Sequence, residues 1–240
     1  MQREVTAMSE TSDLSSYLNA TYFIDSDAPS IVAYANEICR GTGSDEERAI
    51  ALYYAVRDDI RYDPYSMEDR RQALRASAVL EKKAGFCVPK AVLLSAVLRA
   101  KGIPARPGFA DVKNHLATQR MKSMMETDLF VYHGYVEMYL NHKWVKATPA
   151  FNLSLCQNFK VKPLEFDGIH DSLFHEFDAQ GNRHMEYVKD HGTFSDLPYD
   201  TIFKAFRRYY PKVFALNRKE HVETFSREAL GESVQTDRHS

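Results

Sequence analysis

Residues 85–106 read GFCVPKAVLLSAVLRAKGIPAR and place one cysteine where a loop leads into an apolar helix. Pro89 fits the first helical turn, because proline is tolerated where a backbone N–H has no partner to bond. Downstream, Gly102 supplies a C-terminal stop, and Pro104 prevents the helix from resuming. The spacing therefore predicts a helix over about residues 88–101.

Cys87 stands directly before that helix. The first turn of a helix has unpaired N–H groups and a partial positive charge, so we expect the Cys87 thiolate to be stabilised relative to a solvated thiol. The helix is apolar nearly all round, which predicts a central helix wrapped by other elements. The alternative interpretation is that Cys87 is a small hydrophobic residue of the core.

Residues 132–149 read YHGYVEMYLNHKWVKATP and predict a β-hairpin that turns at Asn141 and His142. With a two-residue turn, His133 and Thr148 become diagonal neighbours on one face, with Cα atoms roughly 7 to 8 Å apart. A three-residue turn would separate them, because it shifts the register by one.

A cysteine at a helix start and a histidine on a strand suggest a thiol–imidazole pair. A thiol is only slightly ionised at neutral pH, and a nearby imidazole can take its proton and later return it to a leaving group. The spacing of Cys87 and His133 does not establish such a pair, since a histidine in a strand is more often simply hydrogen-bonded or exposed.

The motifs resemble the transglutaminase-like core, in its bacterial branch of transglutaminase-like cysteine proteases. The resemblance covers about residues 45–152 and rests on IRY at 60–62, GFC at 85–87, LRAKGIPAR at 98–106, HGYVE at 133–137 and WVKATP at 144–149. It implies an α+β, papain-like fold in which a central helix carrying Cys87 packs on an antiparallel sheet carrying His133.

Carried over by the resemblance, the nucleophile falls on Cys87 and the base on His133. The third position departs from the family pattern, since Thr148 stands where the family has an aspartate before the proline. Three accounts stay open: Thr148 orients His133, a nearby residue such as Asn152 replaces it, or the site is weakened or inactive. The backbone N–H of Cys87 is the expected oxyanion donor, and the sequence names no second one.

The function implied is acyl transfer through a Cys87 thioester, first of all hydrolysis of a peptide or amide bond in a peptide or protein substrate. Amine transfer to a protein glutamine differs only in the second nucleophile. A catalytically weakened binding module is the alternative from another class, suggested by the missing acid at position 148.

Composition favours a soluble enzyme, and no cofactor is expected. The 240 residues carry a net charge of -2, which gives no basic footprint for nucleic acid and no preference for a membrane surface. We expect a cytoplasmic protein, because Cys39, Cys87 and Cys156 are few and odd in number, and the N-terminus shows no apolar signal region. The oligomeric state does not follow from the sequence.

Two segments are expected: residues 1–152 form N-terminal helices and the core, and residues 153–240 form a C-terminal extension packed on the same domain. Within them, 106–112 predict a strand, 113–127 a polar loop near the site, and 201–216 a helix. The four histidines of the extension, His170, His175, His184 and His191, have spacings that match no zinc motif, so no metal site is expected.

Overall fold

The computed structural model describes residues 14–114, 119–173 and 185–215. Its helices are α2 (Pro29–Ile38), α3 (Asp45–Asp59), α4 (Ala76–Lys82), α5 (Cys87–Ala100), α6 (Gln119–Met125), α7 (Leu153–Asn158), α8 (Tyr199–Tyr209) and α9 (Pro211–Ala215), with short 3-10 turns η1 (Leu14–Tyr17), η2 (Pro64–Ser66) and η3 (Arg71–Leu74). The strands are β1 (Arg61–Tyr62), β2 (Ala84–Gly85), β3 (Ala105–Asn114), β4 (Leu129–Leu140), β5 (Lys143–Ala147) and β6 (Met185–Thr193). None of these helices is long and apolar enough to cross a membrane.

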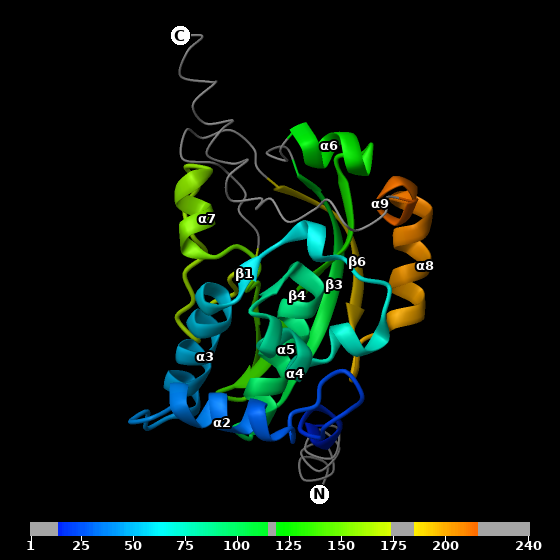
Figure 1. Cartoon of the computed structure of the whole chain (residues 1–240). Helices are drawn as coiled ribbons and strands as arrows, with labels where there is room; N and C mark the ends of the chain where they lie inside the picture. Colours follow the sequence, from blue (N-terminus) through cyan, green and yellow to red (C-terminus); the bar gives the residue numbers. More distant parts are fainter. Residues whose placement is uncertain (1–13, 115–118, 174–184, 216–240) are drawn as a thin grey trace, which may run out of the picture.

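The main sheet has the strand order β5-β4-β3-β6, and its neighbouring strands all run antiparallel. Helix α5 packs on β4 and β3, while α2, α3 and α4 pack against α5 (Figure 1). This arrangement confirms the predicted α+β architecture with a cysteine-bearing helix on an antiparallel sheet.

Helix α5 is the buried centre of the fold. It runs from Cys87 to Ala100, one residue ahead of the predicted span at each end, and every residue from Cys87 to Arg99 is buried. Gly102 follows with φ +74°, a left-handed conformation that suits glycine at a helix end. An apolar sequence without a polar face thus became a helix covered on all sides.

The hairpin β4–β5 has the predicted register. Tyr139 lies opposite Trp144, and Leu140 lies opposite Lys143, with Asn141 and His142 as the two-residue turn. Both turn residues have positive φ, 48° and 64°, the pair of left-handed conformations that a type I′ hairpin requires.

Three predictions outside the core meet different outcomes. The strand expected over 106–112 is confirmed as β3. The loop expected over 113–127 is wrong in part, because β3 continues to Asn114 and α6 forms at Gln119–Met125, while residues 115–118 lie outside the described residues. The helix expected over 201–216 is broken at Tyr210, and Pro211 begins α9 because proline fits a first helical turn.

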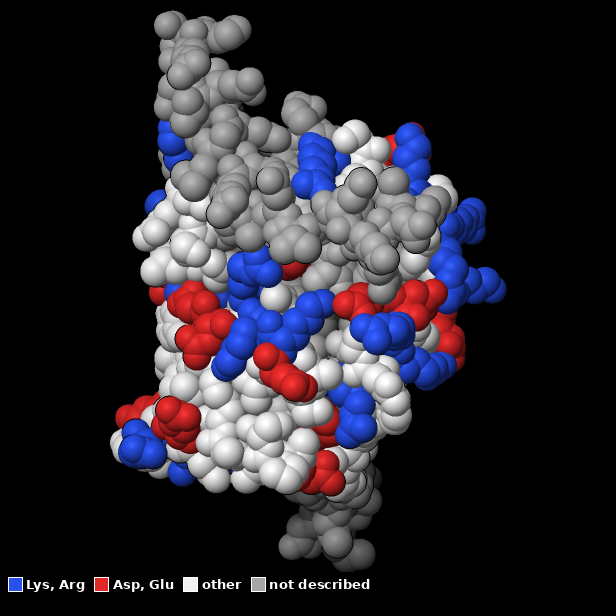
Figure 2. Space-filling model, viewed as in Figure 1, with Lys and Arg blue, Asp and Glu red and all other residues white. Residues whose placement is uncertain are grey.

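Residues beyond 152 contribute a strand to the same sheet. Strand β6 pairs with β3 from Gly108 to Asn114, with two register shifts on the way. The proposed division of the chain at 152 stays a prediction. On the face drawn in Figure 2, basic and acidic side chains intermix, so no single sign of charge dominates that face.

Candidate active site

Cys87 is the first residue of α5, and the chain just before it is fixed by a short parallel strand pair. Tyr62 of β1 lies opposite Gly85 of β2, and the N–H of Asp63 donates to the Gly85 carbonyl at 3.1 Å. The upstream element at 60–62 therefore holds the turn from which Cys87 enters the helix. The cysteine is 8% exposed.

His133 lies on β4 opposite Ala110 of β3 and is buried. The residue before it, Tyr132, has φ 55°, and the ladder shifts register at this point. The Asp111 carboxylate accepts the Tyr132 N–H at 3.0 Å and lies 2.7 Å from Nε2 of His191. A β-bulge re-aims the side chain that follows it, so Asp111 supports the backbone geometry that directs His133.

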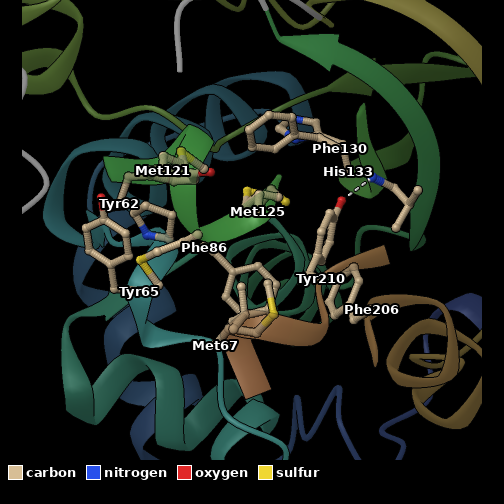
Figure 3. Close-up of a pocket in the computed structure, with 15 residues that line it drawn as sticks. Tyr62, Tyr65, Met67, Phe86, Met121, Met125, Phe130, His133, Phe206 and Tyr210 are labelled. Atoms are coloured by element: carbon tan, nitrogen blue, oxygen red, sulfur yellow. Dashed lines mark hydrogen bonds between the residues drawn. The ribbon is translucent and has the colours of Figure 1, made fainter. Parts of the chain in front are cut away.

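A second contact holds β4 just ahead of that bulge. The Tyr210 hydroxyl accepts the N–H of Val131 at 2.6 Å and donates to the carbonyl of Leu129 at 3.1 Å. Figure 3 shows the first of these bonds, which ties the end of α8 to the strand that carries His133. Sequence patterns gave no signal for this contact.

Strand β4 touches the start of α5 through Gly134. A β-carbon added at Gly134 would lie 2.9 Å from the Cys87 carbonyl oxygen and 3.2 Å from Cβ of Ala91. Only glycine lets the two backbones approach this closely. The structure therefore places Cys87 next to the residue that follows His133, and both side chains line the same pocket.

Two opposing effects act on the Cys87 thiol. Burial raises its pKa to about 11, while hydrogen bonds from the backbone N–H groups of Gly134, Val88 and Cys87 itself lower the pKa. Burial is the larger effect, since removing a thiolate from water costs more than these amides return. The expectation of a stabilised thiolate is thus wrong for this conformation, although the amides that favour the anion are in place.

Thr148 lies near His133, as the hairpin register predicts. Both residues line a second pocket of about 190 Å³, its open mouth included. The Thr148 backbone donates to the Ser172 carbonyl and accepts from the Tyr53 hydroxyl, whereas its buried Oγ1 makes no hydrogen bond. Orientation of His133 by this hydroxyl stays a prediction.

Asn152 has another task. Its Oδ1 accepts the N–H of Tyr62 at 3.0 Å, and its Nδ2 donates to Oγ of Ser154 at 2.7 Å. These bonds tie β1 to the start of α7. Both ends of the amide are engaged, which disfavours Asn152 as the replacement for the missing acid.

The pocket beside Cys87 and His133 has a volume of about 520 Å³, its open mouth included. Figure 3 shows aromatic and methionine side chains gathered around it, with Tyr62 and Tyr65 on one side of the view and Phe130 and His133 on the other. The segment that forms α6 was predicted to lie near the site, but as a polar loop, because a short polar segment with scattered Met residues does not show a helical stripe.

Among the described residues, no group of three or more His, Cys, Asp or Glu side chains is placed to hold a metal ion. His170 instead contacts Asp167, and His191 contacts Asp111. His175 and His184 lie outside the described residues.

A buried cysteine at a helix start and a histidine on the adjoining strand line one pocket of an α+β fold. Residues 32–149 match the family model of the Transglutaminase-like superfamily, and this part of the chain belongs to that superfamily. The match contains Cys87, His133 and Thr148. No curated protein sequence matches the chain.

Solved structures with similar folds include a candidate cysteine protease from Cytophaga hutchinsonii, at 16% identity and a TM-score of 0.46 over 75% of this chain and 54% of that one. A candidate protease from Parabacteroides distasonis ATCC 8503 is 15% identical, with a TM-score of 0.36 over 59% and 26% of the two chains. The periplasmic domain of TgpA from Pseudomonas aeruginosa is 20% identical, with a TM-score of 0.36 over 50% and 42%. The chain thus spans about half the length of the first of these proteins.

Proposed function

We propose that Cys87 and His133 carry out acyl transfer through a thioester, and that the reaction ends in hydrolysis of a peptide or amide bond. One observation carries the proposal: a cysteine at the start of α5 and a histidine on β4 line one pocket, at the point where Gly134 brings strand and helix into contact. Nucleophile and base must share such a site for this chemistry.

In the first half of the reaction, the His133 imidazole accepts the proton of the Cys87 thiol as the sulfur attacks the carbonyl carbon. The imidazolium then protonates the leaving nitrogen, the carbon–nitrogen bond breaks, and a thioester remains on Cys87. Because burial raises the pKa of the resting thiol to about 11, we expect proton removal by His133 to accompany attack.

In the second half, water attacks the thioester carbonyl and gives a proton to His133. The carbon–sulfur bond breaks, the carboxylic acid leaves, and the proton returns to sulfur. The N–H groups of Gly134 and Val88, which lower the pKa of Cys87, stabilise the negative charge on sulfur as it departs. A primary amine in place of water would give transamidation instead.

Two features of the same site support a second candidate function, a peptide-binding module without turnover. Thr148 offers no negative charge to an imidazolium, and the raised pKa of Cys87 leaves the thiol protonated at rest. Such a module would bind peptides in the pocket and form no thioester.

Intact-mass spectrometry of the acyl-enzyme separates these functions. We expect a short-lived adduct on Cys87 when the protein meets N-acetyl-aminoacyl thioesters, which are activated acyl donors. The adduct is lost in Cys87→Ala and forms slowly in His133→Ala. Matched controls are Cys39→Ala and His142→Asn, which change a cysteine and a histidine outside the pocket. Binding of the acyl donor without any Cys87 adduct would contradict the proposed enzymatic activity. A stable amide product in the presence of methylamine would identify transamidation.

A further inference from the structure

The described lining of the pocket next to Cys87 and His133 is mostly apolar. The described residues around it are Met, Phe, Tyr, Val and Pro, apart from the cysteine and the histidine, and none is Asp, Glu, Lys, Arg, Asn or Gln. The Tyr210 hydroxyl, one of its polar atoms, is already bonded to the backbone of β4. A charged or amide side chain placed there would lose its hydration and gain little in exchange.

Methionine supplies much of this lining. Met121, Met124 and Met125 come from α6, and Met67 follows η2 on another part of the wall. Unbranched, polarisable thioethers adapt to ligands of different shape and make favourable contacts with aromatic rings. With its open mouth included, the pocket encloses about 520 Å³, and its flexible methionines can repack around an entering side chain.

We propose, resting on the acyl-transfer function above, that this pocket selects acyl donors whose scissile carbonyl belongs to a residue with a large apolar side chain, such as phenylalanine, methionine or leucine. The side chain enters the methionine-lined pocket while its carbonyl carbon meets Sγ of Cys87 at the pocket wall. Glutamine, the residue that donates the acyl group in protein transamidation, is disfavoured because the described lining offers its amide few polar atoms, namely tyrosine hydroxyls and the His133 ring, in exchange for lost hydration.

The selectivity follows from burial. Contact with an apolar pocket distinguishes side chains by about one to two powers of ten in kcat/KM, because each buried methylene adds only a modest binding free energy. We expect Phe, Met and Leu donors to exceed Ala and Gln donors on that order. The methionine lining predicts a broad preference among the three apolar residues and no sharp choice of one.

N-acetyl-aminoacyl chloromethyl ketones test the pocket directly. Each forms a carbon–sulfur bond to Cys87 as chloride leaves, so mass spectrometry reports occupancy of the pocket without turnover. We expect the Phe reagent to label Cys87 at least about 10-fold faster than the Gln and Ala reagents, after normalisation to their rates with free cysteine. Equal normalised rates for Phe, Gln and Ala would overturn the proposal while leaving Cys87 reactivity, and thus the proposed function, intact.

A charge placed in the lining gives an independent arm. Met124 is half-buried at the pocket, and Met124→Glu should slow labelling by the Phe reagent and speed labelling by N-acetyl-lysyl chloromethyl ketone, each by about 10-fold. Ser123→Glu adds the same charge to an exposed neighbour on α6 and should change neither. Should Met124→Glu unfold, as judged by circular dichroism, Met67→Gln serves with the same expected loss for Phe. An unchanged Phe rate in a folded variant would contradict the proposal.

Discussion

The α-carbon of Gly134 on β4 lies so close to the Cys87 carbonyl of α5 that a hydrogen fits between them and a methyl group does not. A β-carbon at Gly134 would lie 2.9 Å from the Cys87 carbonyl oxygen, and that neighbour is backbone and does not move aside cheaply. The contact holds His133 and Cys87 in one pocket. The proposed reaction therefore depends on the absence of a side chain at position 134.

Gly134→Ala should accordingly separate β4 from the start of α5. We expect a loss of about 1–3 kcal/mol in the free energy of unfolding, as for overpacking of a core, and a larger than 10-fold fall in the rate of Cys87 acylation. Urea denaturation and acylation kinetics measure the two effects. Gly43→Ala is the matched control, since its β-carbon meets only a Glu47 side-chain oxygen at 3.4 Å. Normal acylation in Gly134→Ala would show that this contact does not position the pair.

The Thr148 hydroxyl offers a second prediction. Its Oγ1 is buried and makes no hydrogen bond, so Thr148→Val removes no bond and should leave the stability unchanged or slightly raised. If the hydroxyl orients His133 during the reaction, the same variant slows acylation by about 10-fold, whereas Thr148→Ser, which keeps the hydroxyl, retains most of the rate. That is the expected result. Equal acylation rates for Thr148→Val and Thr148→Ser would show that the Thr148 hydroxyl does not orient His133.

Asp111 is predicted to act as a positioning residue. Its carboxylate accepts the N–H of Tyr132, whose left-handed conformation precedes His133. Asp111→Ala should lower kcat by about 10-fold with little change in KM, because a misplaced base slows chemistry more than binding. Asp111→Asn keeps an oxygen acceptor and should recover part of the loss. A rise in KM alone would instead mean that Asp111 contacts the substrate.

Lys90 predicts a pH effect on stability. The side chain is fully buried and donates to the carbonyls of Arg57 and Ile60, and burial lowers its pKa to about 7. In the unfolded chain a lysine has a pKa near 10.4, so between about pH 7 and 10 the unfolded state binds more protons at this position than the folded state. The free energy of unfolding therefore increases as pH rises through that window. The gain is absent below pH 7, where both states are protonated.

Lys90→Met removes this proton linkage. Urea denaturation at pH 7 and pH 9 should show a smaller increase in stability with pH for the variant than for the natural chain. The exposed Lys204→Met is the control and should keep the original slope. Identical slopes in all three proteins would mean that Lys90 stays protonated in the fold.

Local sequence patterns sufficed for the core. Pro89 and Gly102 mark the ends of α5, and Asn141-His142 sets the register that brings Thr148 near His133. These features depend on neighbours in the chain, so periodicity and turn chemistry reveal them. The resemblance then pointed to Cys87 and His133 as a pair, and the structure places both in one pocket.

Other parts of the site depend on contacts between distant residues. Burial of Cys87 by the surrounding elements reverses the expected direction of its pKa shift. The left-handed Tyr132 is supported by Asp111, 21 residues away, and Tyr210 reaches β4 from a helix 79 residues further along the chain. Helix α6 was predicted as a loop because its apolar methionines line a pocket formed by residues distant in the chain, and the segment alone does not show that partner surface.

The pH dependence of Cys87 labelling by two reagents, each with and without His133, tests the central claim most directly. With iodoacetamide we expect slow labelling at neutral pH that increases towards a pKa of about 11, because the thiolate is scarce in the resting protein. With N-acetyl-phenylalanyl thioester in place of iodoacetamide, acylation of Cys87 should instead be fast near pH 7 and depend on His133, because the imidazole removes the proton during attack. Acylation that follows the same high pKa, unchanged in His133→Ala, would contradict the pair.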